Sequence, residues 1–510
     1  MTNLDFVNYL KIMAFAIVGM VTGCSSSDDA VDIPEIKINV SDLSFENSGG
    51  VNKFSISGAT QVFATSDDPS WCKVQTESSL GVSKLTTVVV NVSENKSSES
   101  RSTQLHIKAD GTTKDIRVTQ EGTKVDKPVP EPEPANDAVA LSRKLGLGWN
   151  LGNQMDAHAN GVANETCWGN GLATQATFDK LAQVGVTTVR IPITWLGKVG
   201  AAPDYTIDEA WLNRVAELVG FAKTAGLNVV INIHHDGADS AHWLDIKGAA
   251  TNEEKNQAVQ AQVAAMWTQI AQKFKDEGDY LIFESFNEIH DGGWGWGDNR
   301  KDGGKQYAVL NQWNQVFVDA VRAVGGENSM RYLAVPGYCT NPDLTIEQLQ
   351  LPDDSANNRL IVAVHFYDPF EYTLNAKFSE WGHTGKDKES WGDESNVTNI
   401  FGKLKTAFVD KNIPVYIGEM GCVHRNNDRA EAFRKYYLEY VCKAAIDHGM
   451  APIYWDNGSA DSGRECSGLI NHANGNFLNN GEEVLEVMTR AVFTQTASYT
   501  LKSVYDSAPK

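Results

Sequence analysis

The stretch from Tyr280 to His290 reads YLIFESFNEIH, and it decides how most of this chain folds. It begins with strand-forming residues, carries Asn287 and Glu288 near its end, and runs directly into a polar, glycine-rich segment. A buried strand that delivers a glutamate to the following loop is how a (β/α)8 barrel presents its chemistry at the carboxyl ends of its strands. The stretch therefore predicts a barrel with a site around Glu288.

A second stretch of the chain has the same form. Residues 413–421 read IPVYIGEMG, a strand pattern that ends in Glu419. For one such glutamate alone, a solvated loop residue would be the better interpretation. Two strand-end carboxylates in one barrel instead indicate an acid/base and nucleophile pair that breaks glycosidic bonds.

Composition narrows the class of protein and of partner. The chain has 510 residues, which is long for a single core, and with 42% hydrophobic and 21% charged residues it is typical of globular domains. Its formal charge of -21 excludes nucleic acid as an expected partner, because phosphate binding requires a positive surface. A neutral carbohydrate polymer is compatible with that charge. Twelve of the 13 Trp residues follow a proline-rich linker, which is where platforms for sugars would be needed.

The N-terminus has the pattern of a lipoprotein signal peptide over residues 1–23. The apolar run at residues 12–21 is too short to span a bilayer comfortably. Residues 21–24 read VTGC and resemble a bacterial lipobox, whose cleavage leaves Cys24 as a lipid-modified N-terminus. The SSSDD that follows resembles the export signal of surface lipoproteins in Bacteroidetes-like bacteria. We expect an outer-membrane lipoprotein that is exposed at the cell surface and anchored by acyl chains.

Two segments separate that signal from the barrel. Residues 33–122 form short alternating runs between Gly, Ser, Asn and Asp turns, which predicts a small all-β sandwich of immunoglobulin-like type. The regions around Trp71 and Arg101 and the terminal VTQEG resemble a BACON domain, which implies a spacer or a carbohydrate-binding accessory. We assign Trp71 to the core and favour a spacer. Residues 123–137 alternate Pro with charged residues and predict a semi-rigid linker.

Residues 138–510 alternate strand and helix patterns eight times, which predicts a (β/α)8 TIM barrel. We expect strands at residues 145–153, 187–193, 228–235, 280–288, 331–337, 360–367, 414–419 and 451–456. We expect helices at residues 174–184, 209–225, 252–275, 311–324, 397–409 and 430–448.

The strand ends carry a set of motifs that resembles glycoside hydrolase family 5, and within it subfamily 4. The motifs are GWNLGN at 148–153, VRIP at 189–192, INIHHD at 231–236, FNE at 286–288, HFYDP at 365–369 and IGE at 417–419. The resemblance extends from about Ala138 to the end of the chain. It implies a retaining double displacement with Glu288 as the general acid/base and Glu419 as the nucleophile. One departure is Gln154, where Thr is more usual, and it concerns only fine substrate preference.

The resemblance also implies roles for the neighbouring residues. Arg190 would lower the pKa of the nucleophile, and Tyr367 would hold one of its oxygens. The acid would keep its proton through a pKa raised by burial or by the negative partner. Asn287 would donate to the sugar 2-hydroxyl, and Trp455 would stack on the sugar at the cleavage point. The further substrate-binding or supporting residues are His234, His235, His365, Asn153 and Trp149.

Other interpretations of these residues were weighed. Residues 234–236 with His365 could suggest a metal cluster, but no H-E-x-x-H occurs and the first strand lacks H-x-H, so we expect no metal. No Gly-rich cofactor-binding loop stands at a strand–helix junction, so we expect no cofactor either. If the strand continues through this pair, alternation places His235 on the opposite face from His234, so that at most one of them would contact the substrate. Six Trp residues lie in or near the loops of the active face, of which two or three would form sugar platforms: Trp195, Trp243, Trp294, Trp296, Trp381 and Trp391. Trp267 and Trp313 fit the core.

The sequence thus predicts an endo-β-1,4-glucanase of the cellulase type that acts on β-glucan. The same machinery directed at xyloglucan, mixed-linkage glucan or mannan is the alternative among enzymes, and a non-catalytic carbohydrate-binding lipoprotein is the alternative of another class. The presence of Glu288, Glu419 and Arg190 disfavours the second alternative. We expect a monomer. The six cysteines other than Cys24 contain no C-x-x-C motif and fit either buried thiols or one or two disulfides.

Overall fold

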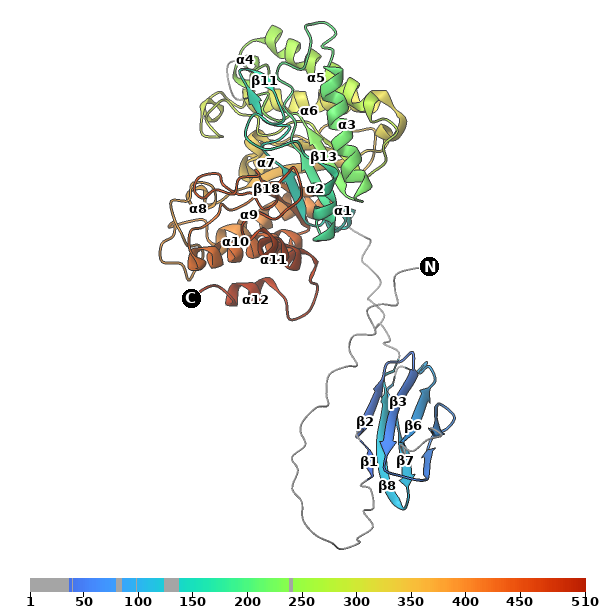
Figure 1. Ribbon diagram of the computed structural model, residues 1–510. Coiled ribbons are helices and arrows are strands. Elements are labelled where there is room, and N and C mark those ends of the chain that lie inside the picture. The colour runs from blue at the N-terminus through green and yellow to red at the C-terminus, as the bar shows by residue number, and fades with distance from the viewer. Residues whose placement is uncertain (1–35, 39, 79–84, 98, 123–136, 238–241) are drawn as a thin grey trace. The chain divides into compact units, whose positions relative to one another are not determined.

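The computed structural model describes residues 36–38, 40–78, 85–97, 99–122, 137–237 and 242–510. The chain forms two compact units that divide between Glu131 and Pro132, within the predicted linker (Figure 1). The predicted signal peptide and Cys24 lie outside the described residues. Within the described ranges, no helix has the length and apolar character needed to cross a membrane. The six described cysteines are all free thiols: Cys72, Cys167, Cys339, Cys422, Cys442 and Cys466.

The first unit is the predicted all-β sandwich of two four-stranded sheets. One sheet has the order β1-β3-β6-β5 and the other β2-β8-β7-β4. Alternation in β7 turns its apolar residues toward the core and its polar residues outward. Trp71 packs against this core, and the guanidinium of Arg101 lies 4.3 Å from the centre of its ring. The strands are β1 (Lys37–Ile38), β2 (Asp42–Phe45), β3 (Gly50–Ser57), β4 (Val62–Ser66), β5 (Cys72–Ser78), β6 (Leu85–Val92), β7 (Arg101–Ala109) and β8 (Thr112–Gln120).

The second unit is a closed parallel barrel of eight strands, as the sequence predicts. Each strand pairs with the next in chain order, and β18 closes the barrel by pairing with β9. Five of the strands are buried along their whole length, because side chains fill the inside and helices cover the outside. The strands are β9 (Gly148–Leu151), β12 (Thr188–Ile191), β13 (Asn228–Asn232), β14 (Leu281–Glu284), β15 (Leu333–Pro336), β16 (Leu360–Phe366), β17 (Val415–Met420) and β18 (Met450–Asp456).

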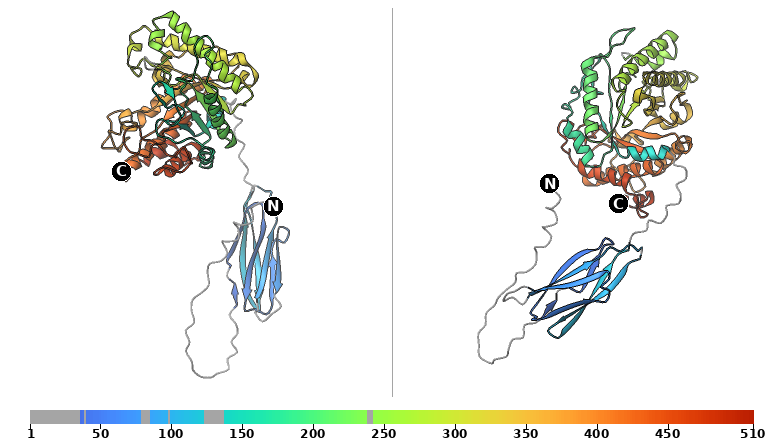
Figure 2. Two further views of the ribbon diagram at one scale, coloured as in Figure 1. Left: turned by 45° about the horizontal axis from the view of Figure 1, so that its top comes forward. Right: turned by 90° about the vertical axis from the view of Figure 1, so that its right-hand side faces the viewer.

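Helices surround the barrel, as Figure 2 shows. Every predicted helix is present, although α6 begins at Lys305 rather than at residue 311. The predicted helices are α2 (Gln175–Gln183), α3 (Glu209–Thr224), α5 (Glu253–Lys273), α6 (Lys305–Val324), α9 (Glu394–Ala407) and α10 (Asp428–Asp447). Further helices are α1 (Asp137–Leu145), α4 (Ile246–Ala249), α7 (Pro342–Gln348), α8 (Phe370–Thr373), α11 (Gly481–Phe493) and α12 (Leu501–Asp506). A short hairpin of β10 (His158–Ala159) and β11 (Val162–Ala163) follows β9.

Helix α1 closes the amino-terminal end of the barrel. Its Leu141 and Leu145 pack against inward-facing side chains of the strands, including Ile282 and Tyr416. Burying each leucine contributes about 1.5–3 kcal/mol relative to leaving it exposed. With this end sealed by apolar contacts, the carboxyl ends of the strands are the open end at which a barrel carries its site.

Candidate active site

Glu419 reaches the site through an irregularity in β17. The pairing of β16 with β17 shifts by one residue between Val364 and His365, so that His365 lies opposite Glu419 and Gly418 is the extra residue. A bulge of this kind re-aims the side chain that follows it. A Cβ on Gly418 would lie 3.1 Å from the Tyr416 ring and 3.2 Å from His365 Nε2, so a larger residue here would crowd both side chains.

Arg190, on β12, is the centre of the charge network. Its side chain is fully buried, and its three nitrogens reach four different side chains. Nη1 donates to Glu419 Oε1 at 2.9 Å and to Asn150 Oδ1 at 3.0 Å. Nη2 donates to Asn287 Oδ1 at 2.8 Å and to Glu284 Oε1 at 2.7 Å. The planar fork therefore fixes both the predicted nucleophile and the predicted 2-hydroxyl partner.

Glu419 has hydrogen-bond donors at both oxygens. Arg190 serves Oε1, and the Tyr367 hydroxyl donates to Oε2 at 3.2 Å. Burial raises the pKa of Glu419 above its usual value, and the nearby His365 and Arg190 oppose that rise. Arg190 acts in the direction the sequence predicts, but the net shift is upward, because this carboxyl is more deeply buried than sequence alone indicates.

Glu288 stands in the loop after β14, and its side chain is partly buried. Its Oε1 lies 2.7 Å from His365 Nδ1. Burial raises the pKa of Glu288, as a general acid requires. One ligand-type atom from each of Glu288, His365 and Glu419 lies within 4.8 Å of the others. This upper limit lies below the roughly 6.5 Å at which a water fits between the carboxyls, and it is compatible with the roughly 5 Å of retaining glycosidases.

A cleft of about 390 Å³ opens beside these carboxyls. Asn287 and Glu288 line it at the barrel end, while loop residues such as Trp168 and Trp294 form its outer part. Trp455, on β18, stacks on the His234 ring with 5.8 Å between ring centroids. His234 Nε2 lies 3.8 Å from Glu419 Oε1, and burial lowers the pKa of this imidazole well below its usual value. His234 is therefore neutral at the site.

Three of the predicted residues differ from expectation in position. The prediction that His235 faces away from His234 is wrong: β13 ends at Asn232, so alternation no longer applies, and both imidazoles line the cleft with 4.4 Å between ring centroids. Trp149 is fully buried, and its Nε1 donates to Asp456 Oδ2 at 2.8 Å, so it supports the barrel end from within. Asn153 follows β9 with φ 54° and accepts, through its carbonyl oxygen, a hydrogen bond from Asn170.

Sequence reasoning missed the buried partners of Arg190. Glu284, the last residue of β14, accepts from Arg190, from Asn232 Nδ2 at 2.8 Å and from the Tyr416 hydroxyl. A charged residue that ends the apolar run Leu281–Phe283 was the available signal, because a buried charge requires a partner. Asn150 links Arg190 to the backbone of the bulge, since its Nδ2 donates to the Gly418 carbonyl at 2.9 Å.

Gln154 does not face the cleft but braces a loop. It is fully buried, and its Nε2 donates to Glu165 Oε1 at 3.0 Å and to the Gly171 carbonyl at 2.8 Å. The loop between those two positions carries Trp168, which is 41% exposed and which the sequence analysis did not single out. Gln154 thereby contributes to the placement of a cleft-lining aromatic side chain.

The tryptophans divide between core and surface. Trp267 and Trp313 are fully buried, as predicted, and so, nearly, are Trp195 and Trp381. Trp243 is partly buried and donates its Nε1 hydrogen to Asp236 Oδ1. Besides Trp168, the exposed ones are Trp294, Trp296 and Trp391, at 60%, 79% and 51%. Trp294 lines the cleft and lies against His290, with 4.2 Å between ring centroids.

Among the residues that the structure describes, two groups of side chains are close enough to hold a metal ion. One group is Glu288, His365 and Glu419, which consists of the two predicted catalytic carboxyls and the imidazole that contacts Glu288. The other is Asp156, His234 and His235. Burial raises the pKa of Asp156 to about 7. A cation that bound there near neutral pH would have to displace this proton where it is present, because metal ligands bind in their deprotonated form.

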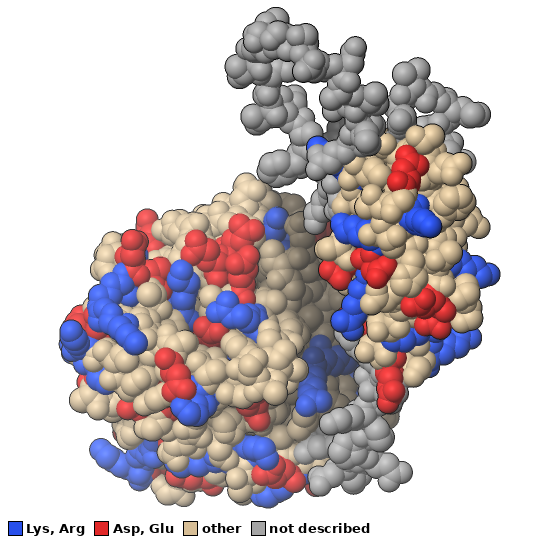
Figure 3. All heavy atoms as spheres, turned by 90° about the horizontal axis from the view of Figure 1, so that it is seen from below, with Lys and Arg blue, Asp and Glu red and all other residues tan. Residues whose placement is uncertain are grey.

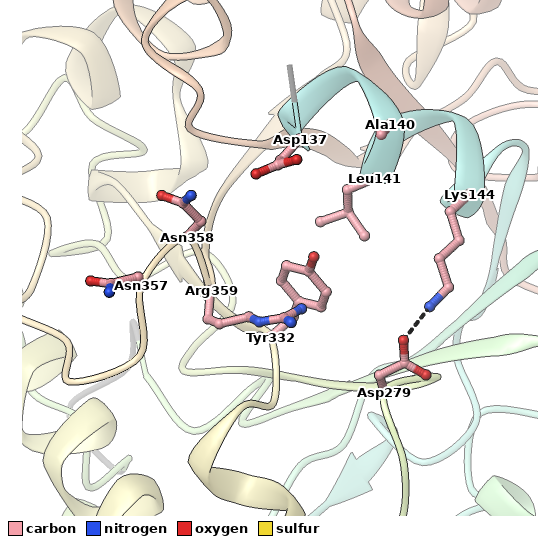
Figure 4. A pocket seen from close by; sticks show the side chains of 9 residues that line it. All are labelled: Asp137, Ala140, Leu141, Lys144, Asp279, Tyr332, Asn357, Asn358 and Arg359. Carbon is pink, nitrogen blue, oxygen red and sulfur yellow. Dashed lines mark hydrogen bonds and ion pairs between the residues drawn. The ribbon is translucent and has the colours of Figure 1, made fainter. Parts of the chain in front are cut away.

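A cavity of about 400 Å³ lies at the opposite end of the barrel (Figure 4). Residues that precede β14, β15 and β16 line it together with α1, so it is remote from the carboxyl ends of the strands. Lys144 pairs with Asp279 at 2.7 Å, and Arg359 lies over the Tyr332 ring. The cation of Lys144 is therefore already paired with a carboxylate of the same lining. Acidic and basic side chains are interspersed over the face shown in Figure 3.

A parallel (β/α)8 barrel with two carboxyls this close at the ends of its strands defines a retaining glycosidase. Comparison with known proteins gives the family. The family model "Cellulase (glycosyl hydrolase family 5)" matches residues 153–461, and the BACON model matches residues 61–121. The chain belongs to glycoside hydrolase family 5, whose members are retaining glycosidases, and it is an endoglucanase-type glycoside hydrolase with an N-terminal BACON domain.

Several known proteins are similar to this chain. A GH5-4 broad specificity endoglucanase from Bacteroides salanitronis is 65% identical, with a TM-score of 0.69, over 70% of this chain and 96% of that chain. Endoglucanase B of Clostridium cellulovorans is 37% identical over 71% of this chain and 78% of its own length. A xyloglucan-specific endo-β-1,4-glucanase of Bacteroides ovatus is 30% identical over 88% of this chain and 92% of its own length.

Proposed function

We propose that this protein hydrolyses internal β-1,4 linkages of glucan chains by double displacement, with Glu419 as nucleophile and Glu288 as acid/base. The observation that carries the assignment is the asymmetry of donors around the two carboxyls. Glu419 accepts from the Arg190 guanidinium and the Tyr367 hydroxyl, whereas the side-chain hydrogen-bond partners of Glu288 are neutral groups, the His365 imidazole and the Thr340 hydroxyl. Fixed donors favour the charged form, so the pair loses its first proton at Glu419 and keeps the second on Glu288.

In the first step a Glu419 oxygen attacks the anomeric carbon of the bound glucosyl unit. The glycosidic C–O bond breaks as Glu288 gives its proton to the leaving oxygen, and the reducing-end fragment departs with a new hydroxyl group. Asn287, held by Arg190 Nη2 at its Oδ1, has its Nδ2 available to donate to the 2-hydroxyl. That contact stabilises the oxocarbenium-like transition state.

In the second step the Glu288 carboxylate takes a proton from water. The water oxygen attacks the anomeric carbon, the ester bond to Glu419 breaks, and the β-configured product leaves. Burial lowers the pKa of His365 to about 4, so this imidazole is neutral during turnover and does not neutralise either carboxylate.

Xyloglucan is the second candidate substrate. The similarity to the xyloglucan-specific enzyme of Bacteroides ovatus covers 88% of this chain, so it includes the BACON domain as well as the barrel. The cleft beside Glu288 is lined in part by the loop aromatics Trp168 and Trp294, which suits a glucan chain that carries sugar substituents. We keep β-glucan as the general substrate class first, because the Bacteroides salanitronis enzyme, which has the higher identity of 65%, is described as a broad specificity endoglucanase.

The N-terminal signal supports a further proposal about location. Cleavage before Cys24 and acylation of its thiol and amine would anchor the enzyme at the outer membrane, with the active barrel at the cell surface. Incorporation of labelled palmitate into the wild-type protein but not into Cys24→Ala tests the anchor. Release of the barrel from whole cells by external protease tests the exposure; protection from that protease would contradict it.

Chemical rescue separates the two catalytic roles. Glu288→Ala should hydrolyse dinitrophenyl cellobioside, which needs little acid assistance, much better than an unactivated aryl cellobioside, and azide should then yield the β-glycosyl azide. Glu419→Ala with azide should yield the α-glycosyl azide. General acid assistance contributes about 10²- to 10⁴-fold, which sets the expected gap between the two leaving groups in Glu288→Ala.

Proton NMR of the first products completes the test. Hydrolysis of carboxymethylcellulose, mixed-linkage glucan, xyloglucan and glucomannan in parallel identifies the preferred polymer. The β-anomer should appear first on each polymer that is cleaved. Initial release of the α-anomer, or azide products with the opposite anomeric assignments, would refute the mechanism.

A further inference from the structure

Glu284 is a fully enclosed carboxylate that does not touch the cleft. Its side chain is 1% exposed, and it is not among the residues that line the cavity beside Glu288. It accepts hydrogen bonds from Arg190 Nε at 3.1 Å and Nη2 at 2.7 Å, from Asn232 Nδ2 at 2.8 Å and from the Tyr416 hydroxyl. So complete a set of donors is what a buried negative charge requires.

The same guanidinium serves both Glu284 and the nucleophile. Glu284 occupies Nε and one hydrogen of Nη2, which leaves Nη1 as the nitrogen that reaches Glu419. The bidentate contact with Glu284 fixes the plane of the guanidinium and so the point from which Nη1 approaches Glu419. One cation is thereby divided between two carboxylates.

The remaining charged and titratable groups around this pair do not replace Arg190. Burial lowers the pKa of His234 and of His365, so both are neutral near pH 6. Burial also keeps the Tyr367 and Tyr416 hydroxyls protonated by raising their pKa values well above the usual value. Within the described residues, the groups that face Glu419 or Glu284 from the neighbouring strands and loops are Arg190, His234, Glu288, His365, Tyr367 and Tyr416.

We propose that Glu284 is a positioning residue for the reaction: its buried charge orients Arg190 and offsets part of the pull that Arg190 exerts on Glu419. This inference rests on the proposed function, because it assumes that Glu419 is the nucleophile. A carboxylate that faces an unopposed guanidinium is less basic and a weaker nucleophile. With Glu284 in place, Glu419 keeps enough basicity to attack while Arg190 still holds it in one orientation.

Glu284→Gln tests the proposal because it removes the charge and preserves the shape. The acid limb of kcat/KM reports the ionisation of the nucleophile in the free enzyme, so it should move to lower pH, by about one unit, the low end of the effect of a nearby charge. On the plateau, inactivation by a 2-deoxy-2-fluoro cellobioside with a good leaving group should slow at least about tenfold, whereas KM changes little. An acid limb at the wild-type pH would overturn the proposal.

Two further variants keep the test decisive if Glu284→Gln folds poorly. Tyr416→Phe removes one hydrogen-bond donor to Glu284, so the pKa of the Glu284 carboxyl rises and less of it is charged in acid. The acid limb of kcat/KM for Tyr416→Phe should therefore also move to lower pH, but by less than for Glu284→Gln. Glu284→Asp keeps the charge, so its limb should stay at the wild-type pH even where kcat falls. A shift in Glu284→Asp equal to that in Glu284→Gln would indicate a merely structural role.

Glu431→Gln is the matched control. Glu431 also pairs with a fully buried arginine, Arg434, but on α10 and away from both carboxyls. It should lose stability without any movement of the acid limb. If azide rescue of Glu419→Ala fails to give the α-glycosyl azide, the proposed function itself is wrong; if that rescue succeeds and the limb of Glu284→Gln is unmoved, only this inference is wrong.

Discussion

Replacing Arg190 by lysine should separate the role of its charge from the role of its shape. Arginine uses three nitrogens to reach Glu284, Asn150, Glu419 and Asn287, whereas lysine has one nitrogen with three hydrogens. At least two charge-assisted hydrogen bonds are therefore lost, and at about 1.5–3 kcal/mol each the cost is about 3–6 kcal/mol. Breaking a buried ion pair costs about 3–5 kcal/mol, which agrees.

Urea unfolding followed by tryptophan fluorescence measures this loss. With a denaturant slope of about 3 kcal/mol per molar or more, the midpoint of the barrel transition should fall by about 1 M. Turnover should fall at least about a hundredfold under conditions in which the variant is still folded, because Glu419 and Asn287 both lose their fixed donor.

Arg331→Lys is the matched control for that experiment. Arg331 is also buried and also donates through all three nitrogens, but to Asn328 and to carbonyl oxygens at the amino-terminal end of the barrel. It should lose a similar amount of stability and keep its kcat. If Arg190→Lys unfolds at the wild-type urea midpoint and keeps a kcat/KM within about threefold of wild type, the role assigned to the planar guanidinium of Arg190 is refuted.

Four further perturbations test other parts of the structure. Burial raises the pKa of Asp156 to about 7, whereas the unfolded chain releases this proton near pH 4, so stability should fall as the pH rises from about 4 to about 7. Asp156→Asn should flatten that dependence and raise the urea midpoint at pH 8; an equally steep curve would contradict it. Gly418→Ala places a Cβ 3.2 Å from His365 Nε2 and should lower kcat at least about tenfold with a smaller change in KM, which steady-state kinetics on an aryl cellobioside measures. Trp294→Ala should raise KM for polysaccharide by about tenfold, because losing an aromatic ring that contacts the sugar costs about 1–2 kcal/mol of binding free energy. Trp391 does not line the cleft beside Glu288, so Trp391→Ala should leave KM unchanged. Incubation with EDTA should leave hydrolysis unchanged, since the proposed steps need no metal; loss of turnover that zinc restores would contradict this.

The barrel was predictable because its information is local. Each barrel strand is a short apolar run bounded by turn residues, and the eight runs occur at intervals that leave room for a helix. Boundaries were less predictable. The run 280–288 was expected to be one strand, but β14 ends at Glu284, because from Ser285 the backbone leaves the regular ladder to form the loop that carries Glu288.

The meeting of the two proposed catalytic carboxyls could be predicted from sequence for a similar reason. In a parallel barrel every strand ends at the same rim, so residues at strand ends converge without any knowledge of packing. His235 shows where this reasoning fails. Its orientation depends on where β13 stops, and a strand that ends at Asn232 instead of His235 brings both imidazoles to the cleft.

Glu284 shows a deeper limit of sequence reasoning, because its role depends on a charge balance and not on a pattern. Its position inside a strand run marks it as unusual, but the run does not reveal that Arg190, from another strand, is divided between it and Glu419. Arg190 lowers the pKa of Glu419, but burial outweighs this effect and keeps that pKa above its usual value. The energetic cost of burying Glu284 is offset by four donor groups that lie on three different strands. In this proposal, Glu284 takes no part in bond making itself. It holds Arg190 in the position from which Arg190 contacts Glu419.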